Sequence, residues 1–506
     1  MSTNAPRSDR FALARRARTR ALTVGLVAGV AMVVAACAGG NLSDGGLLAS
    51  ARTAAPRNAG FNQREINLGR REHPKIVKAF GGTYVDPALQ AYLDQTTDRL
   101  AKTSDRPELS YTVTVLNSPT INAFSLPGGY IYVTRGLLAL ANDSSEIANV
   151  LAHEMAHITA RHAIAREEQA NSAAVMSQVV TDVIRDPEAG QAALALSRGR
   201  LAQFSRQQEL DADVTGIRNA ARAGYDPDGA IDFLRALERQ TELQSKTLNQ
   251  VYDAGRVDIF SSHPATPQRI LAAEREALQV TRNPDMERDR DGYLAIIDGL
   301  PYGDDPREGF VQGRTFIHPE LGITFTLPEG YGLENTSQAV VGFSEAGDII
   351  RFDAVAVPST VSLADYLAAD AVRGGQVTDI TPMTVNGLPA ATATVGGDGW
   401  DFKVAAVRGD GNRVYRFILA SRTMAQARED ELLEAARSFR TIPPEEARSV
   451  RPQRIDIVTV RPGETVEYVS RQMAFEDHRL ERFRALNGLT PADRVRPGQK
   501  VKVVIR

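Results

Sequence analysis

Cysteine, tryptophan and histidine are scarce in this sequence. The 506 residues include one cysteine, one tryptophan and seven histidines. A single cysteine excludes an intramolecular disulfide, and with it any fold that depends on disulfide bonds for stability. Acidic and basic residues nearly cancel, with a net charge of −3, which gives no reason to expect a nucleic-acid partner. After the N-terminal region, no apolar segment is long enough to span a membrane.

Two of the few histidines lie in the segment His153-Glu154-Met155-Ala156-His157. Residues four apart on a helix share a face, so both imidazoles can bind one metal ion. Glu154 would then reach a water molecule on that metal and act as a general base. Upstream, Asp143-Ser144-Ser145-Glu146 has the pattern of a helix start, and apolar residues then recur at helical spacing. The pattern favours a zinc hydrolase over an ordinary helix surface with a solvated glutamate.

A zinc site of this type needs a third protein ligand. His162 lies five residues after His157 with no glycine between them to turn the chain, so we interpret His162 as a structural or surface residue. Glu209 is a better candidate, and Asp213 lies about one helical turn after it. Asp213 could accept the outer N–H of a histidine ligand and fix its tautomer. Taken alone, this acidic segment is also typical of a solvated helix face.

Three separated segments together resemble the HtpX-like and BepA-like zinc metallopeptidases, and the resemblance spans the region from Arg71 to Glu276. Their order along the chain matches the order in that family. The segments are Ile121–Gly129 (Ile-Asn-Ala-Phe-Ser-Leu-Pro-Gly-Gly), His153–His157 and Ser205–Asp213.

The resemblance implies roles for several residues. Glu209 would be the third ligand of one zinc ion per chain, beside His153 and His157, and Asp213 would support the ligands from outside. The edge of a strand would bind the substrate in extended form, as an added strand does. The residues at the end of that strand are Asn122, Ala123 and Phe124. Without the resemblance, an ordinary strand end packed in the core would be the preferred interpretation.

A further segment, Ser261-Ser262-His263-Pro264, also resembles the BepA-like enzymes, in which this histidine can occupy the open zinc position. The resemblance implies that His263 is a latch or fourth ligand. The alternative is a loop histidine near a helix start. The residue that would stabilise an oxyanion is not assigned, and Arg206 and Arg269 are candidates because they are cationic and near the matched segments.

The N-terminal region resembles a bacterial lipoprotein signal. Six arginines precede an uncharged, mostly apolar segment, residues 21–36. The segment ends in Val34-Ala35-Ala36-Cys37, which is similar to a lipobox, so we expect a lipid anchor on Cys37. Ala38 follows in place of the aspartate associated with inner-membrane retention. We therefore expect the periplasmic face of the outer membrane of a Gram-negative bacterium; the alternative is a secreted protein with an incidental cysteine.

The C-terminal residues 454–506 resemble a LysM module, for which a strand, two short helices and a strand are expected. LysM folds bind glycans that contain N-acetylglucosamine, so the resemblance implies peptidoglycan as a partner, although some LysM modules serve only as spacers. The matching segments are Val458–Val466, Phe483–Leu489 and Val495–Val501.

The composition is globular, and the length accommodates roughly three to four domains. We predict a multidomain α+β protein: a mainly helical, gluzincin-type metalloprotease domain with a small edge-strand sheet, an α+β domain with an antiparallel sheet, and a βααβ LysM-like module. The predicted divisions are a signal peptide (1–36), a flexible tether (37–65), the metallopeptidase domain (66–285), a linker (286–315), a domain of unknown function (316–442), a second linker (443–453) and the LysM-like module (454–506).

The predicted function is zinc-dependent hydrolysis of peptide bonds in misfolded or misassembled envelope proteins, by an enzyme anchored to the membrane. Two alternatives stay open. One is a cell-wall-binding scaffold or chaperone-like protein whose protease domain is silent, and the other is a peptidoglycan hydrolase. The expected partners are polypeptide substrates, the membrane and peptidoglycan.

Overall fold

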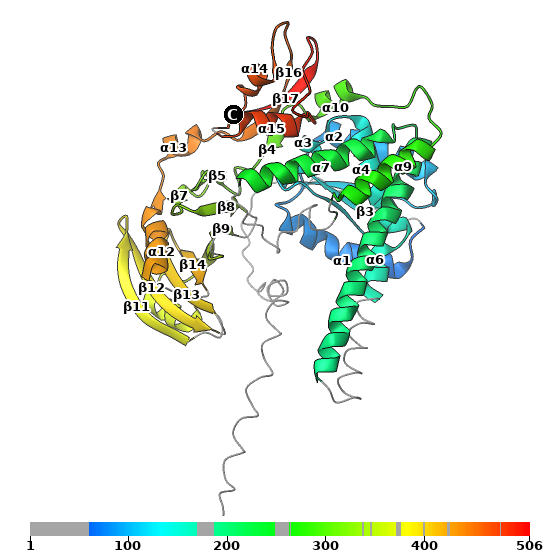
Figure 1. Cartoon of the computed structure of the whole chain (residues 1–506). Coiled ribbons are helices and arrows are strands. Elements are labelled where there is room, and N and C mark those ends of the chain that lie inside the picture. The colour runs from blue at the N-terminus through cyan, green and yellow to red at the C-terminus, as the bar shows by residue number, and fades with distance from the viewer. Residues whose placement is uncertain are drawn as a thin grey trace, which may run out of the picture. The chain divides into compact units, whose positions relative to one another are not determined.

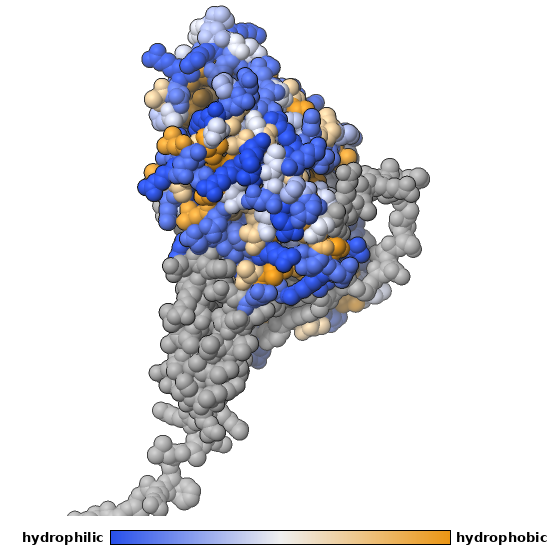
Figure 2. Space-filling model, turned by 90° about the vertical axis from the view of Figure 1, so that its right-hand side faces the viewer, coloured by the Kyte–Doolittle hydropathy of each residue, from blue (hydrophilic) through white to orange (hydrophobic). Residues whose placement is uncertain are grey.

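The computed structural model describes residues 60–168, 187–247, 263, 265–335, 339–344, 347–370, 376–397, 400–421, 426–475 and 477–506. Cys37 and the predicted signal peptide lie outside the described residues. Within the described part, no helix is both long and apolar enough to cross a membrane. Figure 2 shows a face that is mostly hydrophilic, with small separate hydrophobic areas.

The first part of the described chain is mainly helical and contains one small sheet (Figure 1). Its strands are β1 (Thr112–Leu116), β2 (Ala123–Leu126) and β3 (Tyr130–Thr134), in the order β1-β3-β2. β1 runs parallel to β3 and β2 runs antiparallel to it, so β2 lies at the edge. The helices are α1 (Gln63–Ala79), α2 (Pro87–Thr103), α3 (Arg135–Leu140), α4 (Ser144–Thr159), α6 (Pro187–Arg222), α7 (Asp228–Thr247) and α9 (Pro267–Gln279).

Helix α4 lies at the centre of this part and begins where the sequence predicts. The Asp143 carboxylate accepts hydrogen bonds from the N–H groups of Ser145 (2.9 Å) and Glu146 (3.1 Å), so it caps the helix. Apolar residues such as Leu151 and Met155 are each 1% exposed or less. The helix contacts α2, α6, α7 and β2, and burial on several sides explains why almost none of its residues is exposed.

The segment that we expected to be a linker, residues 286–315, contains regular structure. Helix α10 (Arg290–Ile297) lies in the same core as α4, and its fully buried side chains are Tyr293, Leu294 and Ile297. Strand β4 (Pro301–Tyr302) pairs with β16 (Gln453–Thr459) near the C-terminus. The charged, glycine- and proline-containing composition suggested a linker, but the apolar residues of α10 are enough to bury one helical face.

The middle of the chain forms two antiparallel sheets. The larger sheet has the order β11-β12-β13-β14-β10-β9-β8, and the smaller has the order β15-β7-β6-β5. Alternate residues of β13 point to opposite faces of the larger sheet, so Ala405 belongs to one core and Val404 to another. Residues of α12 pack in the first core and residues of α11 in the second.

The elements of this middle region are β5 (Phe310–Gln312), β6 (Thr315–His318), β7 (Ile323–Thr326), β8 (Tyr331–Asn335), β9 (Val340–Ser344), β10 (Ile349–Ala356), α11 (Leu363–Asp370), β11 (Gln376–Val385), β12 (Leu388–Gly397), β13 (Trp400–Arg408), β14 (Arg413–Ser421), α12 (Gln426–Ser438) and β15 (Arg440–Thr441).

The C-terminal module follows α13 (Pro444–Ser449) and begins with β16. It continues with α14 (Val466–Ser470), α15 (Arg479–Leu486) and β17 (Lys500–Ile505). β17 pairs antiparallel with β16, and β4 completes a sheet of order β17-β16-β4. Buried residues of this module belong to the same hydrophobic core as those of α3 and α4. The module is therefore packed against the helical part.

Candidate metal centre

Four side chains from three parts of the chain converge on one buried point. Helix α4 contributes His153 and His157, α6 contributes Glu209, and His263 precedes α9. One ligand atom from each lies within 4.8 Å of the others, so the group could hold a metal ion. The helical repeat explains the pair on α4, because positions four apart share a face.

The distances within this group suit a tetrahedral metal. His153 Nε2 is 3.0 Å from His157 Nε2 and 3.3 Å from His263 Nδ1. The Glu209 oxygens lie 3.5 Å from His153 Nε2 and 3.4 Å from His157 Nε2. Zinc–nitrogen bonds of about 2.0–2.1 Å in tetrahedral geometry separate ligand atoms by about 3.3 Å. Two imidazoles and a carboxylate at these separations fit zinc.

The electrostatics of the group favours a cation. Burial raises the pKa of the Glu209 carboxyl, but His263 and His153 lower the pKa by a larger amount. The net result is a pKa well below its usual range. Burial lowers the pKa of His153, whereas Asp213 and Glu209 raise it to about 10. Burial, together with His153 and His263, lowers the pKa of His157, so this ring is neutral and able to act as a ligand.

Two charged side chains support the ligands from outside. Asp213 Oδ1 lies 3.0 Å from His153 Nδ1, the ring nitrogen opposite the ligand atom. Such a contact sets the tautomer of a histidine ligand. Arg269 donates to both Asp213 oxygens at 2.8 and 2.7 Å, and its Nη1 lies 3.3 Å from Glu209 Oε2. The Arg269 guanidinium is therefore engaged with these carboxylates, while the other oxyanion candidate, Arg206, is exposed on α6.

Glu154 lies between the ligand group and the edge strand and is 2% exposed. Its Oε2 accepts a hydrogen bond of 2.9 Å from Ser125 Oγ on β2. Its Oε1 is 3.8 Å from His263 Nε2. The carboxylate is thus placed to accept a proton from a water molecule beside the ligands. We did not single out Ser125 from the sequence, because no local pattern indicates its contact with Glu154.

His162 is buried and touches a residue of the ligand group. Its Nδ1 is 2.9 Å from His157 Nδ1, and Gln208 donates to its carbonyl oxygen at 3.2 Å. The surface alternative for His162 is therefore wrong. We expected a turn after His157 to need glycine, but Arg161 adopts the left-handed conformation itself, with φ of 55°. The turn brings His162 back to the outer nitrogen of His157.

The segment expected to bind substrate, Asn122 to Phe124, lies at the start of β2 and not at the end of a strand as expected. Asn122 and Ala123 are fully buried, and the Phe124 ring stacks on Tyr132 with centroids 4.9 Å apart. β2 pairs with β3 on one side, and among the described strands none pairs with its other edge. A cavity of about 20 Å³ adjoins this region, and its lining includes Ser125, Pro127, Gly128, His157, Ile158 and Arg161.

Two family models match the chain. Residues 87–277 match Peptidase family M48, and residues 458–504 match the LysM domain. The chain therefore carries a Peptidase M48 domain and a LysM domain, and the resemblances of residues 71–276 to zinc metallopeptidases and of residues 454–506 to a LysM module are confirmed. Peptidase family M48 is zinc-dependent, which agrees with the donor set of the four-residue group.

The curated relatives resemble the peptidase part. The beta-barrel assembly-enhancing protease of Escherichia coli (strain K12) is 30% identical over 220 residues, which cover 42% of this chain and 43% of that protein. The mitochondrial metalloendopeptidase OMA1 of Schizosaccharomyces pombe is 29% identical over 221 residues, 42% of this chain and 62% of that protein. OMA1 of Arabidopsis thaliana is 39% identical over 187 residues, 36% of each chain. The matched region spans less than two thirds of each of these relatives.

Proposed function

We propose that this protein is a zinc-dependent endopeptidase in which His153, His157 and Glu209 hold zinc and Glu154 is the general base. The observation that carries the proposal is the convergence of buried ligand atoms within 4.8 Å, next to a buried carboxylate. The match to Peptidase family M48 and the metalloendopeptidase names of the relatives support it. Zinc held at this group supplies Lewis acidity, which polarises a carbonyl group and lowers the pKa of water.

The side chains around the ligand group have separate roles in the proposed mechanism. Glu154 accepts the proton of the attacking water and later passes it to the leaving amine. Asp213 holds His153 in the tautomer that directs Nε2 toward the other ligands, and Arg269 keeps Asp213 ionised, because it opposes the rise in pKa that burial causes. Ser125 orients the Glu154 carboxylate through its hydrogen bond.

The proposed substrate is a polypeptide bound in extended form along β2. An edge strand can hold a peptide by main-chain hydrogen bonds, as another strand of the sheet would. The start of this strand would be fixed by Asn122, Ala123 and Phe124. The backbone of Asn122 pairs with Thr134, and the Phe124 ring stacks on Tyr132. Ser125 connects this strand directly to Glu154, so the peptide would lie beside the general base.

We also propose that His263 is a latch or fourth ligand. Its Nδ1 lies 2.7 Å from Glu209 Oε2 and 3.3 Å from His153 Nε2, among the ligand atoms. A histidine in this position would occupy the place that the attacking water needs. Displacement of His263 from this position would then allow catalysis.

The cellular setting is proposed from the sequence and the relatives. A lipid anchor on Cys37 would tether the enzyme to the outer membrane, on its periplasmic face, and the LysM domain would bind peptidoglycan. The name beta-barrel assembly-enhancing protease suggests misassembled envelope proteins as substrates. We propose the divisions 66–285, 316–442 and 454–506 for the three folded domains, with α10 and β4 joining the first to the third.

The test is cleavage of casein, as an unfolded protein, by the chain starting after Cys37, beside Glu154→Gln and His263→Ala. We expect Glu154→Gln to retain zinc and to lower turnover by roughly 10²–10⁴-fold, the usual contribution of a general base. We expect His263→Ala to be more active than the unaltered chain. Cleavage that survives Glu154→Gln would reject the mechanism, and unchanged or lower activity of His263→Ala would reject the latch. No cleavage by any form, with zinc bound, would favour the scaffold alternative.

A further inference from the structure

Lys502 from the C-terminal strand β17 is completely buried in a cage of carbonyl groups at the end of α3. Its exposure is 0%, and its Nζ donates hydrogen bonds to the carbonyl oxygens of Ala139 (2.7 Å), Leu140 (3.0 Å) and Ala141 (2.7 Å). An ammonium group has three N–H donors, and all three have acceptors here. The last carbonyls of a helix lack partners within the helix and attract a cation. The C-terminal module thus completes the end of a peptidase helix.

The module holds Lys502 firmly in place. Asn487, which is 4% exposed, donates from Nδ2 to the Lys502 carbonyl at 2.8 Å and accepts from the Lys502 N–H at 2.7 Å. The next residue, Gly488, has a φ of +69°, and a Cβ added to it would lie 3.5 Å from atoms of Arg239 and Asn142. The loop that carries Asn487 and Gly488 therefore lies directly against the peptidase part.

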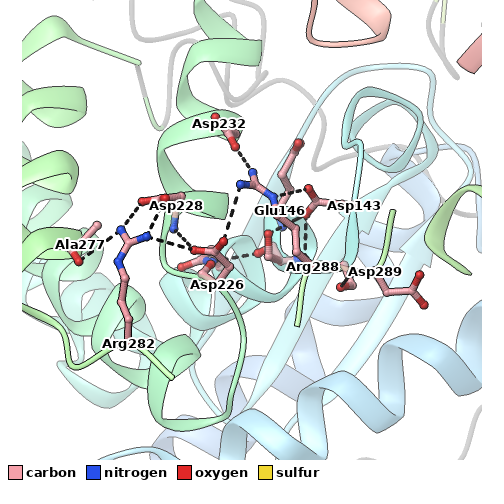
Figure 3. A network of polar contacts seen from close by, with 12 residues as sticks. Asp143, Glu146, Asp226, Asp228, Asp232, Ala277, Arg282, Arg288 and Asp289 are labelled. Carbon is pink, nitrogen blue, oxygen red and sulfur yellow. Dashed lines mark hydrogen bonds and ion pairs between the residues drawn. The ribbon is translucent and has the colours of Figure 1, made fainter. Parts of the chain in front are cut away.

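The carbonyl cage is separated from the metal-binding helix by two residues, Asn142 and Asp143. The Asn142 N–H donates to Glu146 in the first turn of α4 at 3.1 Å, and Asp143 caps the same turn. On the other side Arg288 contacts Asp143 at 3.0 Å (Figure 3). The start of α4 is thus held between the C-terminal module and the segment that leads to α10. His153 lies about 14 Å along the helix from its first residue.

The cage depends on the lysine. Burial lowers the pKa of the Lys502 ammonium, while the buried carboxyl of Glu146 opposes that shift. Loss of the ammonium would leave buried carbonyl groups without their donors, and such groups are unfavourable in a protein interior. The end of α3 would then rearrange to regain partners, and the start of α4 would move with it.

We propose that the LysM domain is an intramolecular positioning element of the metal-binding helix, and that Lys502 is the positioning residue through which it acts. The effect on catalysis rests on the proposed peptidase function, whereas the effect on metal binding does not. Docking of the module fixes the start of α4 and therefore the places of His153 and Glu154. A state in which the module is displaced would bind metal less tightly and turn over more slowly.

The test compares Lys502→Met with Lys500→Met in the full chain purified in detergent. Lys500 lies two residues away on the same strand, is half-buried and forms an ion pair with Asp291 at 3.4 Å, so it is a matched control. For Lys502→Met we expect zinc affinity to fall roughly 10-fold, in the range of contacts that support metal ligands from outside. We expect kcat to fall by a similar factor with little change in KM. The visible spectrum of the cobalt-substituted protein should also change, which a simple loss of stability would not cause.

The outcomes separate the two proposals. If neither the unaltered chain nor His263→Ala cleaves casein, the peptidase function fails, but zinc affinity and the cobalt spectrum still test the positioning role. A folded Lys502→Met with the zinc affinity, cobalt spectrum and kcat of Lys500→Met would overturn the inference. If Lys502→Met does not fold, Lys502→Gln, which retains two donors on a shorter side chain, takes its place, and the same outcomes decide.

Discussion

The two ends of helix α4 both carry buried polar groups, but their charges are balanced differently. At the N-terminal end Arg288 contacts Asp143, Asp226 and Asp232 (Figure 3). Close to that end, Lys502 fills the carbonyl cage of α3. Toward the other end, His153 Nε2 and His157 Nε2 lie 3.0 Å apart beside the Glu209 carboxylate. The first set is complete with the protein's own cations, whereas the second brings together ligand atoms that could hold a metal ion.

This contrast separates a network that is complete without a ligand from one that can bind a metal ion. Buried charges that are paired and hydrogen-bonded contribute to one particular fold, and they leave no ligand atom available. Buried imidazole and carboxylate groups that converge on one point are typical of metal sites. Both networks lie on one helix, so changes at each end can be compared within the same protein.

The largest effect is expected at the metal end, from Glu209→Gln. The substitution keeps the size of the side chain but removes a charged ligand, so zinc affinity should fall by more than the roughly 10–100-fold expected for a residue outside the ligand set. Competition with a chromophoric chelator measures this affinity. Retention of zinc within tenfold of the unaltered affinity would show that Glu209 is not a ligand.

A smaller effect is expected from Asp213→Asn, which weakens the support of His153. Zinc affinity should fall roughly 10–100-fold, because the amide no longer holds the tautomer as a carboxylate does. Asp211→Asn is the matched control, since Asp211 is exposed on the same helix and accepts a hydrogen bond from Gln207 at 2.9 Å. Equal zinc affinities for the two variants would remove Asp213 from the site.

Helical periodicity explains how much of this site the sequence could predict. His153 and His157 are four apart, as are Glu209 and Asp213. The two histidines contact each other, and both carboxylates contact His153, so each pair lies on one face of its helix. The sequence also predicts the cap at Asp143, because this residue with a side-chain oxygen comes just before a segment of apolar residues at helical spacing. Such patterns are local, and local spacing decides which side chains of one helix point the same way.

The remaining contacts depend on conformations and distant segments that spacing does not describe. Arg161 takes a positive φ without being glycine, so the position of His162 could not be predicted from a glycine rule. Lys502 donates a hydrogen bond to Leu140, which is 362 positions away in the sequence. The sequence of the short strand around Lys502 does not indicate that this lysine is buried. Residues 286–315 were expected to be a linker because of their composition, yet α10 and β4 bind the two ends of the described chain together.

The smallest effect is expected at the N-terminal end of α4, from Arg288→Ala. The Arg288 side chain is 38% exposed, so solvent screens its ion pairs, and the free energy of unfolding should fall by only about 1 kcal/mol. Asp143 would still cap α4 through its bonds to Ser145 and Glu146, so zinc affinity should change less than about threefold.

Arg282→Ala is the control for this variant, because Arg282 binds Asp228 with two hydrogen bonds of 2.9 and 2.6 Å and does not touch the cap of α4. Chemical denaturation measures the stability of both variants, and chelator competition measures their zinc affinity. A loss of zinc affinity in Arg288→Ala as large as that in Asp213→Asn would mean that Arg288 also positions the metal site. In that case the capped N-terminus would control the metal site through Arg288 as well as through Lys502, and the charge-paired network would have to be counted as part of the functional site.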